Sequence, residues 1–151
     1  MAVTAGSTVP DLDVTTHEGT STTLRQLADG RCLVVFFYPK AFTGGCTAEA
    51  CHFRDLAAEF EQAGAQRLGV SRDDVDKQAA FASEHGFDYP LLADADGAVA
   101  KAFGAKRPGP LWSKRQTFVL GPDLEVLGVI ASETDMEKHA DEALALLRDR
   151  G

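Results

Sequence analysis

The apolar residues of the chain form either continuous runs, typical of buried strands, or stripes at helical spacing. Residues 32–38 are a continuous apolar run rich in β-branched and aromatic side chains, which predicts a buried strand. After a short loop, apolar side chains at helical spacing predict a helix whose buried face carries Phe53, Leu56, Ala57 and Phe60. This strand–loop–helix unit is the centre of the predicted fold.

The rest of the chain repeats the alternation of strands and helices. Two short N-terminal strands are predicted at 9–14 and 20–23, followed by one helical turn at 24–27. The other expected strands are 66–71, 90–92, 116–120 and 125–131, with helices at 75–85, 97–103 and 134–147, the last starting with a capping box formed by Thr134 and Glu137. Such alternation predicts an α/β fold with a parallel or mixed sheet. With 151 residues, the chain is expected to be one domain over 1–151.

A cysteine lies where the central helix is predicted to begin. The connecting loop contains Pro39, Thr43, Gly44 and Gly45, and Cys46 follows directly. A helix N-terminus presents free N–H groups and about half a positive charge, which stabilises a thiolate. The two glycines allow the backbone to approach a substrate closely. The stretch therefore predicts an activated cysteine nucleophile acting on an oxygen-rich substrate.

The residues of this stretch resemble the active-site pattern P-x-x-x-T-x-x-C of the peroxiredoxins. Pro39, Thr43 and Cys46 fill the pattern, and Cys51 follows five residues after Cys46. The run G-C-T-A-E-A-C is similar to the Q-type, or bacterioferritin-comigratory-protein, branch. The resemblance implies a thioredoxin-like fold with an N-terminal β-hairpin extension. It also implies that Cys46 is the peroxidatic cysteine and Cys51 the resolving one.

A cation is also expected at the site. Arg115, at the head of the strand predicted for 116–120, resembles the arginine that peroxiredoxins bring from a distant strand. Its guanidinium stays charged at any working pH and presents several donors. Glu49, one turn after Cys46, is expected either to orient Arg115 or only to favour the helix start.

Donors for the leaving oxygen are expected from the loop and the helix start. The Gly45 and Cys46 N–H groups and the Thr43 hydroxyl would stabilise the charge that develops as the O–O bond breaks. Pro39 would form a wall of the pocket and shield the oxidised sulfur.

The spacing of the two cysteines creates a geometric conflict. Five residues along an intact helix place the Cα atoms of Cys46 and Cys51 roughly 8.7 Å apart and about 140° around the axis. A disulfide needs Cα atoms within about 7 Å. The first turns of the helix are therefore expected to unwind before Cys51 can react with oxidised Cys46.

Composition limits the compartment and the partners. The net charge of −8 argues against nucleic-acid and anionic-membrane partners. Three cysteines cannot all pair, and no secretory signal or long apolar run is present, which predicts a cytoplasmic protein. The pair Cys46–Cys51 lacks companions at zinc spacing, so neither a metal nor another cofactor is expected. The four histidines, His17, His52, His85 and His139, are expected at the surface.

The sequence thus predicts a thiol peroxidase that reduces hydrogen peroxide and small organic hydroperoxides. The resemblance implies recycling by thioredoxin or a similar dithiol, and a monomer suffices, with a weak homodimer as the alternative. Two rival functions stay open: a thiol–disulfide oxidoreductase of the same fold, although it would favour C-x-x-C, and a non-enzymatic redox sensor. Cys32, inside the apolar run, is expected to be a packing residue.

Overall fold

A five-stranded sheet forms the centre of the protein, seen in a computed structural model that describes residues 5–39, 41–105, 115–132 and 135–150. The strand order is β5-β4-β3-β6-β7. The central strand β3 runs parallel to β4 and antiparallel to β6, so the sheet is mixed. The strands are β3 (Cys32–Phe37), β4 (Ala65–Ser71), β5 (Leu91–Ala93), β6 (Gln116–Leu120) and β7 (Val126–Ala131).

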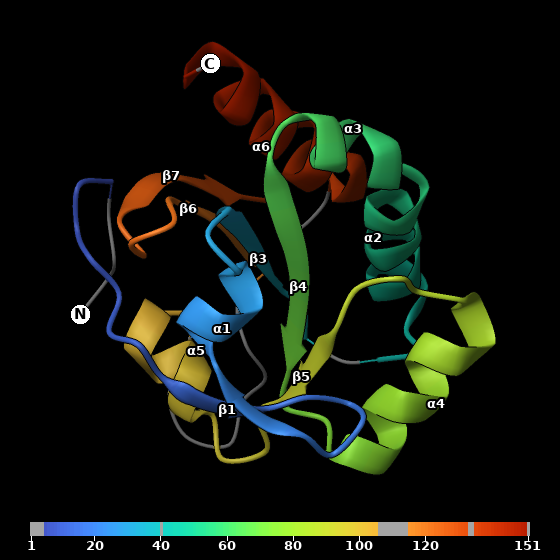
Figure 1. The fold of residues 1–151 in the computed structure, drawn as a ribbon. Coiled ribbons are helices and arrows are strands. Elements are labelled where there is room, and N and C mark those ends of the chain that lie inside the picture. Colours follow the sequence, from blue (N-terminus) through green and yellow to red (C-terminus); the bar gives the residue numbers. More distant parts are fainter. Residues whose placement is uncertain (1–4, 40, 106–114, 133–134, 151) are drawn as a thin grey trace.

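Helices cover both faces of this sheet, and a short hairpin precedes it (Figure 1). The hairpin pairs β1 (Asp13–Thr15) with β2 (Ser21–Thr23) in antiparallel register. The helices are α1 (Leu24–Ala28), α2 (Gly44–Asp55), α3 (Ala57–Gln62), α4 (Val75–His85), α5 (Ala98–Phe103) and α6 (Met136–Arg150). The predicted α/β class with an N-terminal hairpin is confirmed. Among the described residues, none of the helices has the length and apolar character needed to span a bilayer.

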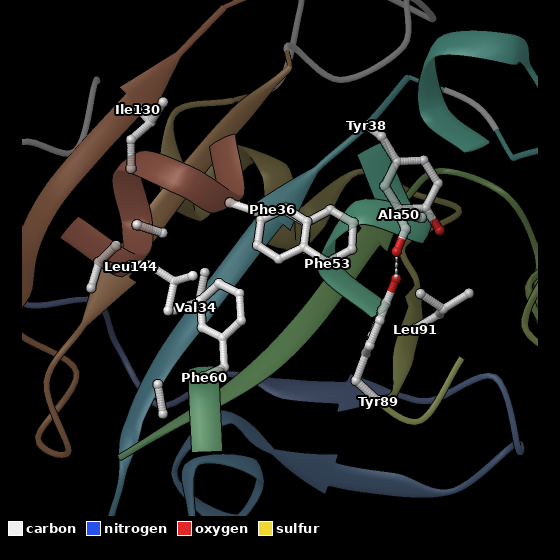
Figure 2. Packing of buried hydrophobic residues seen from close by; sticks show 14 of the residues in the cluster. Val34, Phe36, Tyr38, Ala50, Phe53, Phe60, Tyr89, Leu91, Ile130 and Leu144 are labelled. Atoms are coloured by element: carbon white, nitrogen blue, oxygen red, sulfur yellow. Dashed lines mark hydrogen bonds between the residues drawn. The ribbon is translucent and has the colours of Figure 1, made fainter. Parts of the chain in front are cut away.

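The side chains of β3 alternate between two apolar clusters, which explains its unbroken apolar sequence. Val34 and Phe36 face the cluster that contains side chains of α2, α3, α4 and α6, whereas Val35 and Phe37 face α1 and α5. Phe36 stacks on Phe53 of α2 with ring centroids 4.1 Å apart (Figure 2). Packing on both faces fixes β3, and β3 in turn fixes where its C-terminal loop begins.

Two local expectations differ from the structure. The predicted helical stripe is divided between two helices, because Leu56 leaves the helical conformation (φ −97°, ψ 23°) and α3 restarts at Ala57. The first hairpin strand is shorter than expected, since Val9 bonds the Leu124 carbonyl near β7 and does not extend the hairpin. The predicted capping residue Thr134 lies outside the described residues; in the structure the Asp135 carboxylate accepts a hydrogen bond from the Lys138 N–H at the start of α6.

Candidate active site

The loop between β3 and α2 is tied to the end of the neighbouring strand β4. The Asp73 carboxylate oxygen Oδ2 accepts a hydrogen bond from the Ala41 N–H at 2.7 Å and another from the Ser71 hydroxyl at 2.7 Å. Ser71 is the last residue of β4. The loop that leads to Cys46 is thus held at the carboxyl edge of the two parallel strands, where sites of α/β sheets collect.

Cys46 is the third residue of α2 and is buried, with 1% of its surface exposed. Thr43 is the N-cap residue, in an extended conformation, and lies exposed, whereas Pro39 and Gly45 are half-buried. The N–H groups of the first turn of a helix lack partners inside the helix, and they carry the positive end of the helix dipole. The sulfur therefore lies at a position that favours an anion.

Arg115 reaches Cys46 because of the register between β3 and β6. Gln116, the first residue of β6, pairs with Phe37, the last residue of β3, so Arg115 lies beside the loop that leads to α2. Its Nη2 donates to Cys46 Sγ at 3.3 Å. The predicted meeting of Arg115 and Cys46, which are 69 residues apart in sequence, is present in the structure.

Glu49 holds the other end of the guanidinium. Arg115 Nη1 donates to Glu49 Oε1 at 2.7 Å, and both side chains are buried. Burial lowers the pKa of Arg115, but the charges of Glu49 and Cys46 outweigh it, so this pKa lies above its ordinary value. Of the two expectations for Glu49, the contact that would orient Arg115 is the one the structure contains.

Gly45 lies against both Arg115 and α6. A Cβ atom at Gly45 would lie 3.4 Å from Arg115 Nη2 and 3.3 Å from Met136 Sδ of α6. The contact with Met136 Sδ would be tighter than most carbon contacts, whereas the contact with the guanidinium would be an ordinary van der Waals contact. A small side chain at Gly45 would therefore fill the space beside Arg115 and push mainly on Met136.

The two other cysteines occupy different positions. Cys51 is half-buried and lies in the same continuous helix as Cys46, and none of the three cysteines, all within the described residues, forms a disulfide. Cys32 is buried at the start of β3, so the six-residue strand separates it from the loop by roughly 20 Å. Only Cys51 is close to Cys46 along the chain.

Side chains from other segments hold the backbone of α2 at its middle and near its end. The Tyr89 hydroxyl donates to the Ala50 carbonyl at 2.7 Å (Figure 2), and Arg67 Nη1 donates to the Phe53 carbonyl at 2.8 Å. Burial raises the pKa of Tyr89, so its hydroxyl stays a donor. In contrast, Gly44 and Ala48 of the first turns are exposed.

His139 belongs to the surroundings of the site, and its expected surface location is wrong. It is fully buried, with Nδ1 2.8 Å from Thr117 Oγ1 and 3.6 Å from Glu49 Oε2. Helical spacing could have found it, because it lies three residues after Met136 and four before Ala143 on the buried face of α6. The other three histidines are half-buried.

Comparisons with known proteins place the chain in a family. The sequence profile of the AhpC/TSA family matches residues 5–129. A peroxiredoxin of Mycobacterium tuberculosis H37Rv is 53% identical over 146 residues, covering 95% of each chain, and peroxiredoxin Bcp of Xanthomonas campestris is 40% identical over 144 residues, covering 91% of this chain and 89% of the other.

Solved structures agree with these sequence relatives. The crystal structure of peroxidoxin BcpB from Mycobacterium tuberculosis superposes with a TM-score of 0.93 at 52% identity, covering 97% of both chains. Peroxiredoxin Q of Xanthomonas campestris gives a TM-score of 0.87 at 39% identity, covering 96% of this chain and 97% of that one. The chain belongs to the AhpC/TSA family, whose fold is thioredoxin-like. More particularly, it is a peroxiredoxin similar to the Bcp and Q proteins, and hence a peroxide-reducing enzyme.

Proposed function

We propose that Cys46 is the residue that attacks the peroxide. The Cys46 thiolate forms an S–O bond with one peroxide oxygen, the O–O bond breaks, and the other oxygen leaves and takes up a proton. The products are a sulfenic acid and water or an alcohol. The contact of Arg115 Nη2 with Cys46 Sγ at 3.3 Å carries this proposal, because it places a fixed positive charge beside the sulfur that would react.

The donors for the leaving oxygen come from the start of α2. The N–H groups of Gly45 and Cys46 belong to the first turn of the helix, and Thr43 is its N-cap residue. Together with the Arg115 guanidinium they can stabilise negative charge on the sulfur before attack and on the departing oxygen during it. Pro39, in the loop before α2, would form a wall of the pocket that holds the Cys46 sulfur.

We propose that Cys51 resolves the oxidised cysteine. Its thiol would attack the Cys46 sulfenic acid, forming a disulfide and releasing water. In an unbroken helix the two Cα atoms are roughly 8.7 Å apart, beyond the reach of a disulfide. Gly44 and Ala48 of the first turns are exposed, which supports unwinding that begins there and moves Cys46 toward Cys51. The unwinding is proposed to extend to Ala50, next to Cys51, so the hydrogen bond from Tyr89 opposes it.

The disulfide is then reduced by a dithiol protein such as thioredoxin. The cycle closes within one chain, so a monomer is sufficient for the proposed reaction. Hydrogen peroxide and small organic hydroperoxides are the proposed substrates, and the cytoplasm is the proposed compartment.

Replacing Cys51 tests the proposal that this residue resolves oxidised Cys46. Wild-type protein is expected to consume peroxide continuously with thioredoxin and its reductase. Cys51→Ser should consume about one equivalent per chain and then stop, because the Cys46 sulfenic acid has no partner. Cys32→Ser is the matched control and should continue to turn over, since Cys32 lies at the far end of β3.

Two other outcomes of this assay would change the proposal. Full steady-state activity of Cys51→Ser would assign resolution to another thiol or to the reductant itself. Reduction of insulin disulfides without peroxide consumption by the wild type would favour a thiol–disulfide oxidoreductase.

Loosening the middle of α2 is expected to speed disulfide formation. Tyr89→Phe keeps the ring and removes the bond to the Ala50 carbonyl, next to Cys51. A bond worth about 1 kcal/mol corresponds to a roughly fivefold faster resolution step, if it is lost in the unwound state. Rapid quenching with an alkylating agent, followed by mass spectrometry, measures the conversion of sulfenic acid to disulfide.

The matched control is the other buried tyrosine. Tyr38→Phe loses a comparable bond to Gln78 of α4 and leaves the contacts of Tyr89 intact. An equal acceleration in both variants, or no acceleration in Tyr89→Phe, would mean that this bond does not restrain the helix during resolution.

A further inference from the structure

A buried chain of polar side chains extends from Cys46 to α6. Arg115 bonds both Cys46 and Glu49, and the second carboxylate oxygen of Glu49 lies 3.6 Å from His139 Nδ1. Glu49 and His139 have no exposed surface, and Cys46 and Arg115 have very little. These four side chains therefore lie in a region where any net charge is costly.

The hydrogen bonds of His139 define where its proton can change. Nε2 lies 2.8 Å from the Ser132 carbonyl oxygen, which can only accept, so this nitrogen carries a hydrogen. Nδ1 lies 2.8 Å from the Thr117 hydroxyl, which can either donate or accept. The imidazole can thus be neutral, accepting from Thr117, or protonated at Nδ1 with Glu49 beside it, without any change of geometry.

The summed charge of Cys46, Arg115, Glu49 and His139 depends on which of them holds a proton. With a neutral His139 and a Cys46 thiol, Arg115 and Glu49 cancel. If the thiol alone loses its proton, the sum over these four groups becomes one negative charge. If His139 holds a proton at the same time, the signs alternate from the thiolate through Arg115 and Glu49 to the imidazolium, and the cluster is neutral again.

We propose that His139 is a positioning residue that holds a proton at Nδ1 whenever Cys46 is a thiolate, so that the Cys46–Arg115–Glu49–His139 cluster stays neutral in its reactive state. The inference rests on the proposed role of Cys46. No direct transfer is required: the thiol releases its proton to water, and His139 takes one from water. When peroxide is cleaved, the leaving oxygen needs one proton and His139 has one to release, so the proton count of the step balances.

The groups that face His139 act in opposite directions on its proton. The Glu49 carboxylate and the Cys46 thiolate favour the imidazolium, whereas burial, the Arg115 charge and the positive start of α6 oppose it. Whether His139 is protonated therefore depends on whether Cys46 is a thiolate, so the titrations of His139 and Cys46 are coupled. Among the described residues, these neighbours include Cys46 and Glu49 from α2, Arg115 and Thr117 at β6, and the Ser132 carbonyl after β7.

A measurement that leaves His139 intact tests the coupling. The imidazole resonances of His139 are followed by NMR against pH in reduced wild type and in Cys46→Ser, which cannot form a thiolate. We expect His139 to be protonated in wild type at a pH where alkylation identifies Cys46 as a thiolate, and to hold its proton less firmly in Cys46→Ser. Identical titrations, or a neutral His139 beside the wild-type thiolate, would overturn the inference.

A substitution tests the consequence for the reaction. His139→Gln keeps a donor for the Ser132 carbonyl but cannot take up a proton. We expect peroxide reduction to be about tenfold slower at neutral pH and to approach the wild-type rate at alkaline pH, with alkylation of Cys46 shifted to higher pH. His85→Gln, a histidine substitution in α4, is the matched control and should leave the pH profile unchanged. A rate lowered by the same factor at every pH would indicate only a structural role.

Failure of the underlying proposal gives a different result. If Cys46 were not the reacting residue, its alkylation in wild type would leave peroxide reduction intact. If only the role of His139 is wrong, alkylation of Cys46 abolishes peroxide reduction, and His139 titrates identically in wild type and in Cys46→Ser.

Discussion

Cys46→Ser is expected to abolish peroxide reduction, leaving only the rate seen without enzyme. A serine hydroxyl stays protonated at working pH and is a weak nucleophile toward peroxide oxygen, so neither Arg115 nor the helix start can compensate. Serine is close to cysteine in size, and its hydroxyl can accept the bond that Arg115 Nη2 gives to the sulfur. The variant should therefore fold normally.

The measurement is peroxide consumption in a single turnover, before any reductant is needed. Unfolding curves of Cys46→Ser and wild type provide the control for the fold. Loss of one equivalent of peroxide in Cys46→Ser would show that another residue is oxidised first, and the reactive site would have to be placed elsewhere.

Arg115→Lys is expected to slow the reaction with peroxide about 100-fold, the size of effect seen when one donor to a developing anion is removed. Lysine keeps the charge, but one ammonium cannot reproduce the planar fork that bonds Glu49 Oε1 and Cys46 Sγ together. The loss should appear in the second-order rate constant with peroxide, measured under single-turnover conditions.

A pair of variants separates catalysis from stability. Arg115→Gln alone removes the guanidinium that bonds the buried Glu49 carboxylate, and breaking a comparable buried pair costs about 3–5 kcal/mol. Adding Glu49→Gln removes that charge, so the double variant should regain much of the stability but none of the rate. A double variant as active as wild type would mean that the guanidinium serves the fold and not the reaction.

Much of this arrangement could be predicted from the chain because it depends on local patterns. The apolar run of β3 and the glycine-rich loop placed Cys46 at a helix start, and α4 has the bounds predicted for it, 75–85. The contact between Arg115 and Cys46 could be expected only through the resemblance. Its physical cause, the antiparallel register of β6 against β3, is a pairing between distant segments.

The features that were missed depend on contacts between elements. The break at Leu56 leaves the apolar stripe uninterrupted, so helical periodicity alone does not reveal it. His139 was predicted at the surface, although its helical spacing places it on the buried face of α6. The Tyr89 bond to α2 joins residues 39 positions apart and has no local signal.

The antiparallel strand β6 also has a consequence for synthesis of the chain. Cys46 and Glu49 emerge from the ribosome early, but their partners Arg115 and His139 come much later, from the segment before β6 and from α6. A nascent chain that ends before these residues contains the thiol without the cation that is proposed to activate it. We therefore expect the growing polypeptide to be spared premature oxidation, with sensitivity toward peroxide arising only once translation is nearly complete.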